Sequence, residues 1–141
     1  MRKPKIGLLP LYLKLYDDTM PEIRPRMVAF YNTITEALRE RKLDVVTSDF
    51  CRVADEFRNA IRHFEEAGAD AIVTLHLAYS PSLESADILA DSRLPLIVLD
   101  TTEAYEFGPQ QAPGELMFNH GIHGVQDLCS VLLRKGKPFQ I

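Results

Sequence analysis

The sequence predicts an α/β fold of three layers, in which helices cover both faces of a doubly wound parallel sheet. Short runs rich in Val, Ile and Leu alternate along the chain with segments whose apolar residues recur at helical spacing. The runs are continuously apolar, as expected for parallel strands that are covered on both faces. Strands that alternate with helices connect by right-handed crossovers, and the simplest strand order is the flavodoxin-like order 2-1-3-4-5.

The strands and helices can be placed in order along the chain. The first helix carries Met27 and Phe30 at the spacing of one buried face. Gly68 suits the C-cap of the second helix, Ser82 the N-cap of the third and Asn119 the N-cap of the fourth. The expected strands are residues 5–11, 43–49, 69–76 and 94–100, and the expected helices are about residues 22–42, 53–67, 82–92 and 121–135.

The chain shows no internal repeat, low-complexity tract or linker, so residues 1–141 form one expected domain. Residues 136–141, GKPFQI, read as the beginning of a further strand. We therefore expect an N-terminal part of a longer, multidomain polypeptide; the alternative is a short edge strand at the end of the domain.

Composition excludes several classes of function. The chain is 46% hydrophobic and 26% charged with a net charge of -4, and it has no run of basic residues that would bind nucleic acid. No apolar run approaches the roughly 20 residues of a membrane span. Cys51 and Cys129 lack metal-ligand spacing, and Cys129 lies in an apolar helix where a thiol packs as a small hydrophobe. A soluble, cytoplasmic protein is expected.

In such a sheet, ligands bind beyond the carboxyl ends of the strands, near the point where the strand order reverses. The loop after the first strand has no glycine-rich turn, and the chain has no GxGxxG or GxxxxGK[ST] motif, which disfavours a nucleotide cofactor. Its polar groups suit a polyhydroxylated ligand, although packed tyrosines and solvated charges would explain them equally. They are Tyr12, Lys14, Tyr16, Asp17 and Asp18.

Three histidines fall at the same edge. His76 ends the third strand and is either a ligand-binding side chain or a buffer between the core and solvent. His120 and His123 lie at a helix start, where free N–H groups and the helix dipole favour a developing oxyanion and a neutral imidazole. The pair could contact sugar hydroxyls, share a metal or simply begin the helix. No carboxylate has the spacing that a shared metal would need.

Three segments together resemble the L-fucose isomerase and L-arabinose isomerase family. NHGIHGVQDL (119–128) is similar to the family's Asn-x-x-x-His-Gly segment, and TLHLAYSPS (74–82) is similar to its His-x-x-[Phe/Tyr]-Ser-Pro segment. LPLYLKLYDD (9–18) falls where the family has its first substrate loop. TTEAY (101–105) and GIHGVQD (121–127) differ from the arabinose isomerases, so the sugar could be arabinose, fucose or another pentose or deoxyhexose.

The resemblance implies an N-terminal domain of an enzyme that interconverts an aldose and a ketose through an enediol. It implies that Mn²⁺ or another divalent metal and the catalytic carboxylates lie outside this chain, so that residues 1–141 alone are inactive and bind no cofactor. By the same resemblance His123 touches the sugar in a neighbouring subunit's site, near Lys14, Tyr16 and Asp17, with the C-terminal domains and a homo-oligomer as partners. The alternative is a free-standing flavodoxin-like module that binds a small molecule or regulates without catalysis.

Overall fold

The computed structural model describes residues 2–141 and confirms the α/β class. Its sheet is wholly parallel, in the order β2-β1-β3-β4. The strands are β1 (Lys5–Leu11), β2 (Asp44–Thr47), β3 (Ala71–His76) and β4 (Leu96–Leu99). The helices are α1 (Lys14–Thr19), α2 (Arg24–Glu40), α3 (Ala54–Glu66), α4 (Ala86–Asp91), α5 (Leu116–Asn119) and α6 (Gly121–Arg134), and single 3-10 turns lie at Pro21–Ile23, Ser82–Glu84 and Pro113–Glu115.

The strand order agrees with the expected 2-1-3-4-5, except at its last member. The fifth strand is reduced to one parallel bridge between Gln140 and Ile97. The amide of Val98 donates to the Gln140 carbonyl at 2.7 Å, and the Gln140 amide donates to Leu96 at 3.0 Å. Residues 136–141 therefore begin to extend the sheet beside β4, as their sequence suggests, but pair with it at one residue only.

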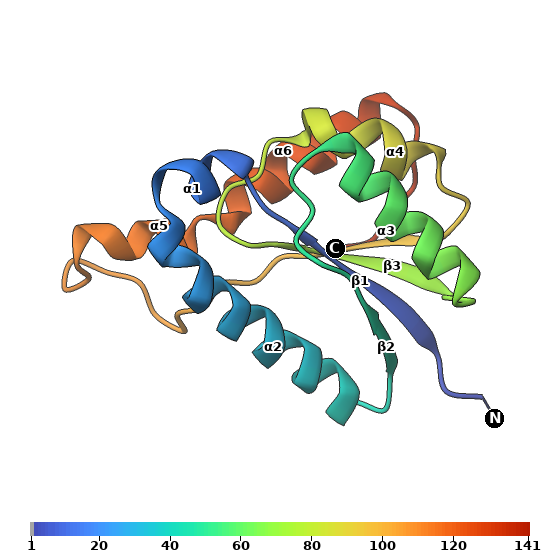
Figure 1. Cartoon of the computed structure of the whole chain (residues 1–141), viewed down its shortest axis with the longest axis horizontal. Coiled ribbons are helices and arrows are strands. Elements are labelled where there is room, and N and C mark those ends of the chain that lie inside the picture. The colour runs from blue at the N-terminus through green and yellow to red at the C-terminus, as the bar shows by residue number, and fades with distance from the viewer. Residues whose placement is uncertain (1) are drawn as a thin grey trace.

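The two faces of the sheet carry separate apolar clusters, because successive side chains of a strand point to opposite faces. Figure 1 shows α2 on one side of the sheet and α3, α4 and α6 on the other. Leu9, Leu11 and Ile72 pack with the buried residues of α3, α4 and α6. Leu8 and Leu75 pack on the opposite face with those of α1 and α2. The structure is thus a three-layer sandwich with its polar loops at the strand ends.

Two glycines explain how α3 fits against the sheet. The Phe64 ring packs directly on Gly7 of β1, where an added Cβ would fall 2.3 Å from the ring. Gly68 has a φ of 72° just after α3, and its amide donates to the Glu65 carbonyl at 3.0 Å. This left-handed residue ends the helix and returns the chain to β3, which confirms the expected C-cap.

Local interactions differ from the sequence expectation at two places. Residues 14–19, expected as part of a loop, form the short helix α1. Ser82 does not cap a helix: its hydroxyl donates to a carboxylate oxygen of Asp127 at 2.7 Å, and the regular helix α4 begins only at Ala86. The cap preference of serine gives way to a contact with a distant residue of α6. Among residues 2–141, no helix has both the length and the apolar character needed to cross a membrane.

Candidate functional site

The carboxyl edge of the sheet brings together side chains from the three segments that carry the family resemblance. Tyr16 of α1 lies close to Tyr79, which follows β3, and burial raises the pKa of Tyr16. The Tyr79 ring stacks on His120, with 6.3 Å between the ring centroids, and the His120 and His123 rings are 5.8 Å apart. The rings of Tyr79, His120 and His123 form a row that ends in the first turn of α6, and Tyr16 lies beside its Tyr79 end. We call these four residues the aromatic row.

The two histidines of the aromatic row differ in their surroundings. His123 is exposed, and its Nδ1 lies 3.1 Å from the His120 carbonyl oxygen. With the proton on Nδ1, this nitrogen donates to that carbonyl, and Nε2 is left to accept a hydrogen bond from a ligand hydroxyl. His120 is partly buried, and both burial and the nearby His123 lower its pKa. His120 is therefore held in the neutral form at physiological pH.

The turn after β3 is built by close backbone packing. Ala78 has a φ of 63°, a left-handed conformation that is uncommon for a residue with a Cβ. The amide of Leu77 donates to the Leu11 carbonyl at 2.9 Å, which extends the pairing of β1 and β3 by one residue. An added Cβ on Gly121 would lie 3.0 Å from the His76 carbonyl oxygen, so the start of α6 packs directly on this turn. These contacts set the position of Tyr79 relative to α6.

His76 lies beneath this edge rather than in the aromatic row. It is 2% exposed and packs against Gly124 of α6. Neither of its ring nitrogens has a hydrogen-bond partner within residues 2–141. Burial lowers the pKa of His76 to about 4, although the nearby Asp127 opposes this shift. Of its two possible roles, the structure gives it the position of a neutral core side chain that supports α6.

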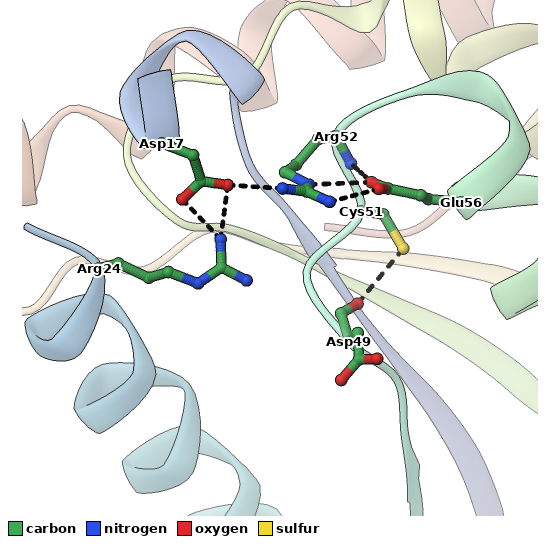
Figure 2. Close-up of polar contacts among 6 residues, drawn as sticks. All are labelled: Asp17, Arg24, Asp49, Cys51, Arg52 and Glu56. Atoms are coloured by element: carbon green, nitrogen blue, oxygen red, sulfur yellow. Dashed lines mark hydrogen bonds and ion pairs between the residues drawn. The ribbon is translucent and has the colours of Figure 1, made fainter. Parts of the chain in front are cut away.

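The charged residues expected in the loop after the first strand lie in α1 and differ in their surroundings. Lys14 is exposed at the first position of α1, while Asp17 is directed to two arginines (Figure 2). Both Asp17 oxygens accept from Arg24 at 2.6 Å, and one also accepts from Arg52 at 2.8 Å. Burial alone would raise the pKa of Asp17, but hydrogen bonds from the two arginines outweigh it and lower the pKa. Most acceptor sites of Asp17 are therefore already occupied by protein groups.

The arginine network continues away from the aromatic row. Arg52 donates through Nη2 and Nε to the two carboxylate oxygens of Glu56, at 2.6 and 3.2 Å (Figure 2). Next to it, the Cys51 thiol points to the Asp49 carbonyl oxygen at 3.4 Å. Burial raises the pKa of Cys51 to about 12, so this thiol stays protonated and unreactive.

A large groove that the sequence analysis did not anticipate lies beside the network. It has a volume of about 920 Å³ and runs between α2 and α3, next to β2 at the outer edge of the sheet. Ser48 and Asp49, the two polar residues directly after β2, were the signal that could have indicated it, because they also fall at a strand's carboxyl end. Its lining includes Asn32, Arg39, Ser48, Arg52, Asn59 and His63.

Asn119 does not have the role expected from the sequence. It is the last residue of α5, and His120 occupies the N-cap position of α6 without a side-chain cap. The Asn119 Oδ1 accepts from the Ala104 amide at 2.8 Å, and its Nδ2 donates to the Glu115 carbonyl at 2.9 Å. The cap prediction was wrong because the side chain binds the preceding loop instead of the following helix.

Within residues 2–141, no three His, Cys, Asp or Glu side chains come close enough together to hold a metal ion. His120 and His123 therefore lie without a third such residue at ligand distance in this part of the chain. Compared with known proteins, the chain matches no protein-family model, and no curated protein matches its sequence.

Proposed function

We propose that this chain is the N-terminal substrate-recognition and oligomerisation domain of a sugar ketol-isomerase that resembles the L-fucose and L-arabinose isomerases. One observation carries the proposal: the three segments that bear the resemblance meet at the carboxyl edge of the sheet, in the aromatic row. Tyr16, Tyr79 and the two histidines are adjacent there although more than 100 residues separate Tyr16 from His120 in the sequence.

The chemistry of the aromatic row suits a pentose or deoxyhexose. A sugar offers hydroxyl groups for hydrogen bonds and patches of C–H groups that pack on aromatic rings. The exposed Nε2 of His123 accepts from a hydroxyl, and the partly exposed ring of Tyr79 provides a packing surface. Lys14, exposed on α1 two residues before Tyr16, adds an ammonium donor near this edge of the sheet. Asp17 orients Arg24 and Arg52 rather than the sugar.

The proposal gives this chain contacts with the sugar and leaves the proton transfer to residues outside it. Mn²⁺ or another divalent metal, held by those residues, would supply Lewis-acid stabilisation of the enediol. The exposed position of His123 suits a contact made across a subunit boundary in a homo-oligomer. A cytoplasmic setting is part of the proposal and is supported by the free, buried thiols of Cys51 and Cys129.

A titration of this chain with L-fucose and L-arabinose, followed by amide and histidine-ring NMR signals, tests the proposal. With few contacts available, we expect dissociation constants on the order of 10 mM, and shifts that centre on Tyr79, His120 and His123. His123→Ala should weaken binding by about 3- to 10-fold, the value of one hydrogen bond. His63→Ala, which removes an exposed histidine of α3, is the matched control and should leave binding unchanged. The proposal fails if sugar shifts no signal of the aromatic row.

The groove between α2 and α3 favours a second candidate, a free-standing module that binds a small molecule without catalysis. Its volume of about 920 Å³ would hold a ligand of ordinary size. The same NMR experiment separates the two candidates by location. Shifts confined to Asn32, Asn59 and His63 would support the module, whereas shifts in the aromatic row support the isomerase domain.

A further inference from the structure

The long segment between β4 and α6, residues 100–120, is tied to the body of the molecule by one arginine. Arg26 lies in the first turn of α2 and donates from Nε to both carboxylate oxygens of Glu103, each at 2.9 Å. Its terminal nitrogens donate to the two carboxylate oxygens of Glu115, at 2.9 and 2.6 Å. One guanidinium thus joins the beginning of the segment to its end. Figure 1 shows this segment passing near the start of α2.

The same guanidinium also holds the helix that precedes the two histidines. The Cζ atom of Arg26 lies 3.7 Å from the centre of the Phe118 ring in α5. This distance is well inside the range of about 6 Å at which a cation is attracted by the face of an aromatic ring. Arg26 therefore contacts the segment at three residues, and each contact uses a different part of the guanidinium group.

Asn119 connects the part of the segment that Arg26 holds to the aromatic row. Its side chain accepts from the Ala104 amide and donates to the Glu115 carbonyl, at 2.8 and 2.9 Å. The loop that holds Glu103 and the turn that holds Glu115 are thereby joined next to His120. A movement of the segment away from Arg26 would move His120, and with it the stacking on Tyr79.

We infer that Arg26 is a positioning residue that fixes residues 100–119 and so sets the place of His120 and His123 beside Tyr79. Single exposed ion pairs contribute little, and the side chains of Arg26, Glu103 and Glu115 are 38%, 30% and 29% exposed. Here a two-pronged contact with Glu115, a second carboxylate and an aromatic ring act on one planar group. Lysine cannot replace it, because an ammonium has no planar fork of donors. The inference rests on the proposed function only for what the histidines then bind.

Amide hydrogen exchange and the NMR signals of the two histidine rings test the inference without any ligand. In Arg26→Gln we expect the Ala104 amide and the amides of α5 to exchange about 5- to 30-fold faster, with unchanged exchange in β1 and β3. The His120 ring signals should shift as its stacking on Tyr79 loosens. Arg26→Lys should behave like Arg26→Gln. Arg39→Gln is the matched control, because Arg39 lies on the same helix and pairs only with Glu36 among the described residues.

A folded Arg26→Gln protein with wild-type exchange at Ala104 and unmoved His120 signals would overturn the inference. If Arg26→Gln does not fold, the double variant Glu103→Gln/Glu115→Gln removes the same ion pairs and leaves α2 intact, and wild-type exchange in it would overturn the inference equally. The outcome is separable from the proposed function. Faster exchange in the variant together with a wild-type chain that binds neither L-fucose nor L-arabinose sustains the role of Arg26 and sinks the sugar site.

Discussion

Gly124 lies so close to His76 that a Cβ added to the glycine would fall 2.4 Å from Cδ2 of the imidazole ring. The contact joins the fourth residue of α6 to the last residue of the buried strand β3. Glycine inside a helix is ordinarily unfavourable by about 1 kcal/mol relative to alanine. Here the missing side chain is what lets α6 approach the end of β3, and the first turn of α6 then reaches the aromatic row.

Gly124→Ala should therefore destabilise the protein in spite of its better helix propensity. Overpacking a core contact costs about 1–3 kcal/mol, and the propensity gain of about 1 kcal/mol offsets part of it. We expect a lower midpoint in urea denaturation. Gly114→Ala is the control, because an added Cβ there would meet nothing within 4 Å. Equal midpoints for the two variants would contradict the steric account.

His76 should make the stability of the protein depend on pH. Burial lowers its pKa from 6.5 to about 4, so between these values the unfolded chain binds a proton that the folded chain does not. The free energy of unfolding should have its full value above pH 6.5 and fall by up to about 3 kcal/mol as the pH drops toward 4. In His76→Leu this slope should be smaller.

Urea denaturation at several values of pH measures the effect of His76. His63→Asn serves as the control, because His63 is exposed on α3. The control should keep the wild-type slope between pH 6.5 and 4. A wild-type slope in His76→Leu would show that another group titrates over this window.

Substitutions at the neighbouring residues Asp17 and Asp18 should have unequal effects on the stability of the protein. Asp17→Asn removes the charge that binds Arg24 and Arg52, and we expect a loss of about 1 kcal/mol, kept small because the Arg24 side chain is 37% exposed. Asp18→Asn, at an exposed position of the same helix, should have little effect. Because the Asp17 pKa is lowered, its contribution is present above pH 3.8 and disappears as the pH falls through the folded-state pKa. Equal denaturation midpoints for the two variants at pH 7 would argue against the network.

Asn119→Ala should cost about 1 kcal/mol, because it leaves the Ala104 amide without its acceptor. The loss should come from the loop rather than from the helix that follows. Hydrogen exchange should therefore quicken at Ala104, while the amides in the middle of α6 keep their protection. Asn59→Ala, at an exposed position of α3, is the control. Faster exchange along α6 instead would restore the cap role.

Much of the fold was predictable because it depends on the periodicity of apolar residues. The runs at 5–11 and 69–76 are buried throughout or nearly so in β1 and β3, and the expected helices at 22–42 and 53–67 correspond to α2 and α3. Gly68 was predictable for a local reason, since only its own backbone conformation decides the end of α3. The roles of Ser82 and Asn119 were not predictable from local sequence. Each side chain could have capped a nearby helix, but in the folded chain it binds a residue that is distant in sequence instead.

The sequence by itself determined the strands, their parallel order and the edge of the sheet at which polar residues gather. These features depend on the spacing of apolar residues and on the alternation of strands with helices, and both can be read directly from the sequence. Only the tertiary structure decided how those residues divide. His76 lies under Gly124, Asp17 is paired with two arginines, and His123 remains exposed. Arg26, which gave no signal in the sequence, holds the segment before the two histidines. Such pairings join groups far apart in sequence, and their geometry exists only once the layers have packed.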